Sequence, residues 1–210
     1  MNNRLSVRAS CQTVMTTEWR RKTRLNEPVR VPPVDALSVV NFPTEAALLA
    51  DVEKQLMAGK GFAIATLNLD HVVKMRRNPA FLRAYLAHTH VVADGNPIVW
   101  LSRLAGRSEV SLVPGSELIA PMAALAARLG TPIAFFCSTE PVLALAAERL
   151  TADYPGLQVA ACLAPPYGFD PDGAAADALL DQVAASGARI CLLALGAPKQ
   201  ELLAARGLAR

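Results

Sequence analysis

Short apolar runs alternate along the chain with longer segments of helical periodicity, and this alternation limits the fold more than any other feature. The runs predict strands over residues 62–66, 90–93, 132–137, 157–162 and 189–195. The segments between them predict helices over 44–57, 71–88 with an interruption near Asn78, 98–105, 116–129, 140–154, 171–186 and from Pro198 to the end. Strands separated by helices of this length are typical of a parallel sheet covered on both faces. We therefore expect a single-domain α/β fold with a Rossmann-like parallel sheet, for which 210 residues suffice.

The charge is distributed unevenly. The net charge of +3 is too small to indicate a nucleic-acid partner. Residues 1–30 hold seven Lys and Arg against two acidic residues, a charge of +5, so the other 180 residues carry −2. We expect residues 1–30 to be a disordered basic tail and residues 31–210 to be the domain. The alternative for the tail is contact with anionic lipid or an acidic partner.

Neither a membrane span nor a metal site is indicated. The longest uncharged stretch, residues 154–169, is interrupted by five Pro and Gly residues, so it does not predict a membrane-spanning helix. The segment before the domain lacks the apolar core of a secretory signal, so we expect a cytoplasmic protein. The three histidines lack the spacing of zinc ligands, and no cofactor is indicated. Cys137, Cys162 and Cys191 lie in apolar runs and are expected to be buried thiols.

Ligands of such sheets bind at the carboxyl ends of the strands, and polar residues gather there. Asp94-Gly95 follows the run 90–93. Asp94 is therefore a candidate general base that accepts a proton from a bound hydroxyl. The alternative is an ordinary Asp-Gly turn.

Thr66 ends the run 62–66, and Asn68 follows two residues later. Residues two apart in an extended chain point the same way, so a hydroxyl and an amide could together hold a sugar or a phosphate. The alternative is that Asn68 or Asp70 caps the following helix.

Gly196-Ala-Pro-Lys-Gln-Glu201 joins the last strand to the last helix. Amides at a helix start favour an anion, Lys199 adds positive charge, and Gln200 offers both a donor and an acceptor, so the segment suits a nucleotide diphosphate. The alternative is a well-capped helix start. Neither a Walker motif nor G-x-G-x-x-G is present.

Two further loops are candidates. In Pro114-Gly115-Ser116-Glu117, either Ser116 caps the next helix or the loop amides meet a ligand. Tyr167-Gly168-Phe169 could form a stacking wall for a base or sugar.

Six segments in order, TLNLDHV (66–72), VVADGNPIVW (91–100), VPGSELI (113–119), ERLTADYPGLQV (148–159), PPYGFDP (165–171) and LLALGAPKQE (192–201), resemble the WecG/TagA/CpsF glycosyltransferases. The resemblance covers residues 34–210. It implies inverting transfer of a sugar from a UDP-sugar to a polyprenyl-diphosphate-linked sugar acceptor, for exopolysaccharide or other cell-surface polysaccharide, at the inner face of the membrane. It implies no metal.

The resemblance also assigns site residues. Asp94 matches the family's general base, Thr66 and Asn68 match its substrate-contacting pair, and Gln200 matches its active-site glutamine, with Lys199 and Glu201 in the same motif. Gly95, Gly115 and Ser116 lie in the other matching segments and are expected to bind substrate. Apolar helices and a sheet edge make a homo-oligomer an expectation as well.

The chain departs from the family pattern in three places. Cys137-Ser138-Thr139 stands where a glycine pair is usual, and Asn96-Pro97 stands where small residues are usual. Members also continue beyond the position that matches Arg210, so we expect the family's C-terminal end to be lacking. The alternative function is accordingly a truncated, non-catalytic nucleotide-sugar-binding domain.

Overall fold

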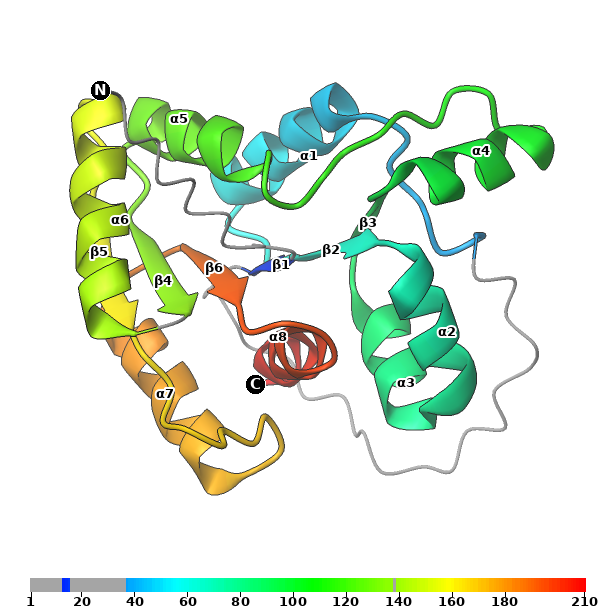
Figure 1. Cartoon of the computed structure of the whole chain (residues 1–210). Coiled ribbons are helices and arrows are strands. Elements are labelled where there is room, and N and C mark those ends of the chain that lie inside the picture. Colours follow the sequence, from blue (N-terminus) through cyan, green and yellow to red (C-terminus); the bar gives the residue numbers. More distant parts are fainter. Residues whose placement is uncertain (1–12, 16–36, 138) are drawn as a thin grey trace, which may run out of the picture.

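The computed structural model of the chain describes residues 13–15, 37–137 and 139–210 (Figure 1). Its centre is one six-stranded sheet with the strand order β3-β2-β1-β6-β4-β5. The strands are β1 (Thr13–Met15), β2 (Ala63–Leu67), β3 (His90–Ala93), β4 (Ile133–Cys137), β5 (Val159–Leu163) and β6 (Ile190–Ala194). The helices are α1 (Glu45–Met57), α2 (Leu69–Arg77), α3 (Pro79–Ala87), α4 (Asn96–Leu104), α5 (Ile119–Leu129), α6 (Glu140–Asp153), α7 (Ala174–Ala185) and α8 (Lys199–Leu208).

The sheet consists of two parallel groups joined by one antiparallel strand. β2 and β3 are parallel, and so are β6, β4 and β5. β1 lies between the groups and runs antiparallel to both, with Thr13 opposite Ala65 on one side and Leu193 on the other. The prediction of an α/β fold is confirmed. The five predicted strands all run in the same direction, as expected, whereas β1, which was not predicted, runs opposite to them and makes the sheet mixed.

β1 also corrects the prediction for the tail. Residues 13–15 lie in the segment expected to be disordered, yet they form a central strand. A strand of three residues is too short for a period of two to stand out, and its pairing partners lie far away in the chain. The remainder of the predicted basic tail lies outside the described residues.

Alternate residues of the strands face opposite layers of helices. Ile64, Phe135 and Leu192 point into a core made with α1, α5 and α6. Ala63, Phe136 and Leu193 point into a second core made with α7 and α8. At the β2–β3 end, a third core joins the sheet to α2, α3 and α4. Both faces are therefore covered by helices, as the alternating pattern predicts (Figure 1).

The predicted helix over residues 71–88 is two helices. Asn78 breaks it, because its Oδ1 accepts hydrogen bonds from the amides of Ala80 (3.0 Å) and Phe81 (3.1 Å). Pro79 then occupies the first turn of α3, where a missing N–H costs nothing. The interruption predicted near Asn78 is thus confirmed, and Phe81 and Tyr85 of α3 lie in the third core.

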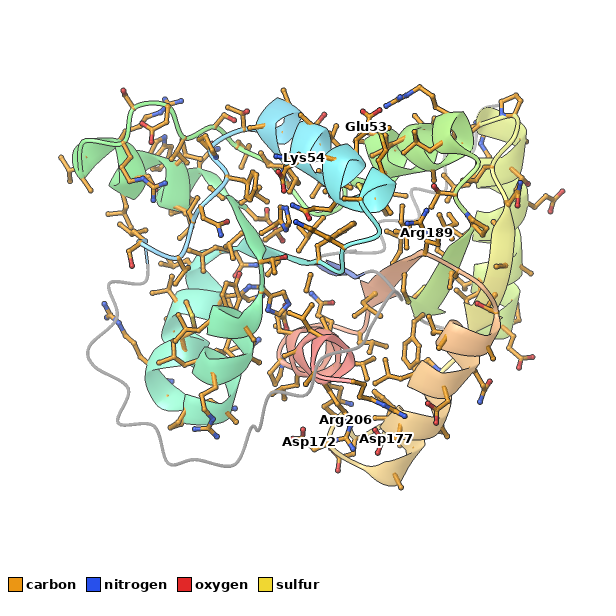
Figure 2. The ribbon with its side chains drawn as sticks, turned by 180° about the vertical axis from the view of Figure 1, so that it is seen from behind. Glu53, Lys54, Asp172, Asp177, Arg189 and Arg206 are labelled. Carbon is orange, nitrogen blue, oxygen red and sulfur yellow. The ribbon has the colours of Figure 1, made fainter. Side chains whose placement is uncertain are left out.

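Arg206 fastens α8 to α7 (Figure 2). Its Nε and Nη2 donate to the two carboxylate oxygens of Asp177 at 2.9 and 2.7 Å, and its Nη1 donates to the carbonyl of Asp172 at 3.0 Å. The fork geometry matches a carboxylate in two places at once. Since α8 begins at the candidate site, this clamp orients the segment that carries Lys199, Gln200 and Glu201.

The three described cysteines differ in burial. Cys137 and Cys191 are buried, as predicted, whereas Cys162 is exposed, because its side chain points outward from the edge strand β5. Among the described residues, no helix combines the length and the apolar character that crossing a bilayer requires.

Candidate active site at the carboxyl ends of β2, β3 and β6

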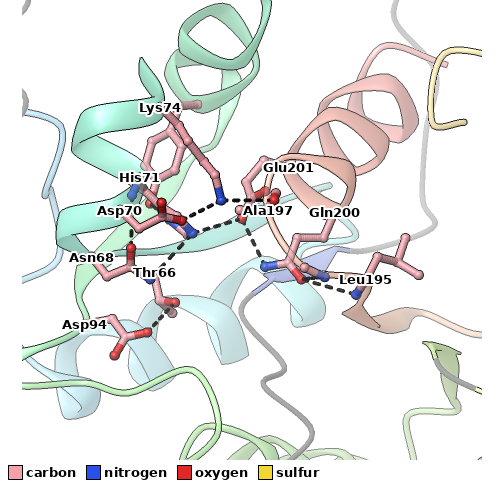
Figure 3. Close-up of polar contacts among 12 residues, drawn as sticks. Thr66, Asn68, Asp70, His71, Lys74, Asp94, Leu195, Ala197, Gln200 and Glu201 are labelled. Atoms are coloured by element: carbon pink, nitrogen blue, oxygen red, sulfur yellow. Dashed lines mark hydrogen bonds and ion pairs between the residues drawn. The ribbon is translucent and has the colours of Figure 1, made fainter. Parts of the chain in front are cut away.

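Asp94 is held at the carboxyl edge of the sheet by three contacts. Its amide donates to the carbonyl of Leu67 at 2.7 Å, which extends the β2–β3 ladder by one residue. Its Oδ2 accepts a hydrogen bond from the Thr66 hydroxyl at 3.2 Å (Figure 3). The backbone amide of Gly115 also donates to the carboxylate. Residues from β2, β3 and the loop before α5 therefore fix one carboxylate in place.

The surroundings make Asp94 a stronger base than an ordinary aspartate. Burial raises the pKa of its carboxyl, the hydrogen bonds from Thr66 and Gly115 lower it in part, and the charge of Glu117 raises it again. The side chain is half-buried, so a ligand can still reach it. A fixed, accessible carboxylate with a raised pKa suits proton abstraction from a hydroxyl.

Gly95 makes the turn from β3 into α4. Its φ of 98° lies in the region that side chains rarely adopt, while a Cβ there would meet only Pro97 Cδ at 3.7 Å. Its carbonyl accepts the first hydrogen bond of α4, from Ile98 at 3.1 Å. The glycine is thus needed for backbone conformation, and the Asp-Gly turn and the carboxylate at the site are parts of one feature.

Thr66 and Asn68 have different partners. Thr66 is fully buried and its hydroxyl bonds Asp94. Asn68 caps α2, because its Oδ1 accepts from the amide of His71 at 3.0 Å. The capping alternative for Asn68 is therefore confirmed, while Asp70 lies inside the helix. A role for either residue in binding substrate stays a prediction.

The side chain of Gln200 holds the loop between β6 and α8 in its conformation through hydrogen bonds. This side chain is fully buried, and its Oε1 accepts from the amides of Leu195 (3.3 Å) and Gly196 (3.1 Å). Its Nε2 donates to Oε1 of Glu201 at 3.0 Å. These bonds give Gln200 a positioning role in the motif, whatever else it contacts.

The amides at the start of α8 are already used within the loop. Lys199 and Gln200 donate to the carbonyl of Gly196 at 3.0 and 3.4 Å, and the amides of Leu195 and Gly196 donate to Gln200. The expectation that free amides here bind an anion is therefore wrong for these four groups, because the Gln200 carboxamide and the tight turn satisfy them first. Lys199, half-buried at the first position of α8, remains the candidate of this segment for contact with an anionic ligand.

Glu201 lies deeper than the sequence indicates. It is fully buried, and its Oε1 is 3.9 Å from Nε2 of His71. Its Oε2 has no hydrogen-bond partner among the described residues. Burial raises the pKa of Glu201 to about 7. A carboxyl of this kind is held partly protonated near neutral pH, which suits an internal hydrogen-bond role better than a surface one.

His71 and Lys74 of α2 belong to this network, and the sequence reasoning missed both. His71 is buried, its Nδ1 lies 3.3 Å from the Tyr85 hydroxyl, and burial lowers its pKa to about 4. Lys74 pairs with Asp70 and donates to the carbonyl of Ala197 at 3.1 Å, which ties α2 to the loop before α8 (Figure 3). Their positions one helical turn apart after Asn68 are the signal that could have placed them on one face.

Two predictions concern the loop before α5: that Ser116 caps the helix, and that the loop amides meet a ligand. α5 begins at Ile119, with Leu118 before it and no side-chain cap, so the prediction that Ser116 caps this helix is wrong. Ser116 is exposed, whereas Gly115 is buried with its amide on Asp94. The loop is anchored by the amide of Val113, which donates to the carbonyl of Ala93 at 2.8 Å. A loop amide thus reaches the site, and contact of Ser116 with substrate stays a prediction.

The proposed stacking wall is reduced to one residue. Phe169 is buried against Phe136, with ring centroids 5.6 Å apart, so it belongs to the core and cannot stack on a ligand. Tyr167 is fully exposed.

Within the described part of the chain, no group of three or more His, Cys, Asp or Glu is arranged to hold a metal ion.

Comparison with known protein families matches residues 34–210 to the glycosyl transferase WecG/TagA/CpsF family. The chain belongs to this family. A similar protein from Bacillus spizizenii strain W23 is named N-acetylglucosaminyldiphosphoundecaprenol N-acetyl-beta-D-mannosaminyltransferase and is 28% identical over 144 residues. The match covers 68% of this chain and 53% of that relative, so the chain spans about half the length of the relative.

Proposed function

We propose that the chain is an inverting glycosyltransferase that moves a sugar from a UDP-sugar to a polyprenyl-diphosphate-linked sugar acceptor. Its product would serve exopolysaccharide or other cell-surface polysaccharide synthesis at the inner face of the cell membrane. The observation that carries the proposal is Asp94, a half-buried carboxylate of raised pKa fixed by Thr66 and Gly115 at the carboxyl edge of the sheet. Membership of the family supports the reaction type, and the name of the Bacillus relative supports a lipid-linked acceptor.

The reaction follows as a single displacement. Asp94 takes the proton from an acceptor hydroxyl while that oxygen forms a bond to the anomeric carbon of the donor sugar. The bond between this carbon and the diphosphate oxygen breaks, and UDP leaves with the electron pair. The attack comes from the side opposite to UDP, so the configuration at the anomeric carbon inverts, and Asp94 then releases its proton to water.

Charge on the departing diphosphate needs a stabilising group, because it grows in the transition state. We assign this role to Lys199, since the amides of its own loop donate to Gly196 and Gln200. Gln200 and Glu201 would act by holding the loop that carries Lys199. Thr66 would act by orienting Asp94, while Asn68, Gly95, Gly115 and Ser116 would line the substrate site.

UDP release by the purified chain tests the proposal. A panel of UDP-sugars would be offered with a lipid-diphosphate-sugar acceptor in detergent, with Asp94→Asn beside the wild type and Asp153→Asn as the matched control on an exposed carboxylate at the end of α6. Release with one donor, retained in Asp153→Asn and lost in Asp94→Asn, is the expected result. UDP binding without release from any donor would contradict turnover and favour the nucleotide-sugar-binding domain instead.

A further inference from the structure

Helix α4 is apolar on both of its faces. Its inner face places Ile98, Val99 and Ser102 in the interior. Its outer face carries Pro97, Trp100, Leu101 and Leu104, which are spaced as i, i+3, i+4 and i+7 and so form one stripe. Trp100 is 64% exposed, Leu101 42% and Leu104 86%. A helix of a monomeric domain ordinarily turns polar side chains outward, so this stripe indicates a partner.

The stripe is next to the candidate active site. α4 begins at Asn96, two residues after Asp94, and Gly95 is its N-cap. Nine residues make a helix of about 13 Å, so every side chain of the stripe lies within roughly that distance of the turn that holds Asp94. A partner that covers the stripe therefore lies beside the candidate active site.

The charge of the helix favours an anionic partner. α4 contains no acidic residue, and its one charged side chain, Arg103, is exposed beside the stripe. Arg107, just beyond the helix, is half-buried; it donates to the carbonyls of Leu37 and Val40 and lies 3.6 Å from Glu109. Arg103 is thus the cation of α4 that is available to an outside group.

The small size of the stripe distinguishes between possible partners. Its side chains expose roughly 400 Å², about half of what each partner of a stable protein dimer buries. A short helix with Trp and Leu on one side and an exposed Arg beside them instead suits the interface of a lipid bilayer, where Trp and Arg both prefer the headgroup level. We propose that the outer face of α4 docks on the anionic surface of the membrane and thereby brings Asp94 to the level of lipid-linked acceptors, an inference whose catalytic part rests on the function proposed above.

Vesicle sedimentation tests the docking surface directly. The full chain would be mixed with vesicles of phosphatidylglycerol and phosphatidylcholine, and with vesicles of phosphatidylcholine alone. The test variant is W100S/L104S. The matched control is V142S/L145S, which removes two exposed apolar side chains from α6. Circular dichroism would verify that both variants fold.

We expect the wild type and V142S/L145S to sediment with the anionic vesicles, and W100S/L104S to bind at least about tenfold more weakly, because two apolar side chains no longer enter the interface. Arg103→Glu should weaken binding to the anionic vesicles alone. Sedimentation of W100S/L104S equal to that of the wild type would overturn the proposal. A second result would also overturn it: the wild type is a dimer in gel filtration, W100S/L104S is a monomer, and neither protein binds vesicles. The stripe would then be an interface between two copies of the chain.

UDP release separates this inference from the proposed function. With the acceptor embedded in vesicles, W100S/L104S should lose turnover, whereas with a short-chain, water-soluble acceptor it should match the wild type. If neither acceptor supports release but vesicle binding still depends on Trp100 and Leu104, the proposed function fails and the docking surface stands. If W100S/L104S is active on both acceptors and binds vesicles normally, the docking surface fails and the function stands.

Discussion

Replacing Thr66 by Val should shift the acidic limb of the reaction to higher pH. The substitution keeps the shape of a fully buried side chain and removes the hydroxyl that donates to Asp94 Oδ2 at 3.2 Å. That hydrogen bond lowers the pKa of Asp94, so its loss raises the pKa. A base must be unprotonated to act, so the rate falls as the pH drops through this pKa, and a higher pKa moves that fall upward.

The size of the shift follows from the energy of the bond. A hydrogen bond to a charged group contributes about 1.5 kcal/mol or somewhat more, and one pKa unit corresponds to about 1.4 kcal/mol. We therefore expect the acidic limb of kcat/KM for UDP release to move up by about one pH unit in Thr66→Val, with the rate on the plateau reduced far less than in Asp94→Asn.

The matched control is Thr131→Val, which removes the hydroxyl of another buried threonine, on the loop between α5 and β4. Its acidic limb should coincide with that of the wild type. A Thr66→Val profile that is lower at every pH with an unmoved limb would refute the reasoning, because Thr66 would then act on something other than the basicity of Asp94.

Three further predictions concern the structure around the site. In Glu201→Gln, urea denaturation should show a gain in the free energy of unfolding over the wild type that grows from about pH 5 to about pH 8. The pKa of Glu201 is about 7 in the folded protein and lower in the unfolded chain, so the buried carboxyl costs stability as the pH rises from the unfolded pKa through the folded pKa. A gain independent of pH would contradict this. Lys74→Met should lower the free energy of unfolding by about 1 kcal/mol in the same assay, because it removes the hydrogen bond to the Ala197 carbonyl. The exposed ion pair of Lys74 with Asp70 adds little. No change would mean that the hydrogen bond to Ala197 adds nothing to stability. Phe81→Ala should cost about 3–5 kcal/mol by thermal or urea unfolding because Phe81 is fully buried, whereas Leu145→Ala on the surface should stay within about 0.5 kcal/mol; equal effects would dispute the assignment of the third core.

The fold could be predicted where the sequence carries its own local signals. Apolar runs and helix ends placed five strands and seven helical segments close to observed elements, and Asn78-Pro79 marked the break that divides one of these segments into α2 and α3 because an Asx cap and a proline act locally. β1 was not predictable in this way. Its three residues are placed by pairing with β2 and β6, strands that follow far later in the chain.

The candidate site likewise contains features that the sequence predicts and features that depend on packing. Asp94 and Thr66 could each be predicted to lie at the carboxyl edge of the sheet, because ligands of parallel sheets bind there. That their strands are neighbours, which brings the two side chains into contact, is seen only in the structure. The inward position of Glu201 and its approach to His71 depend on how α8 packs beside α2 and α3, which no local pattern encodes. Likewise, Phe169 is an aromatic residue after a strand in the sequence but a core residue in the structure.

The most direct measurement of the central claim compares Asp94→Asn with the wild type in two assays on the same preparations, UDP binding by calorimetry and UDP release with donor and acceptor present. If Asp94 is the base for the acceptor hydroxyl, the variant will bind UDP as the wild type does, and its turnover will fall by about 10²–10⁴-fold. Turnover equal to that of the wild type would contradict the account, and so would a loss of UDP binding that explains the whole fall in rate.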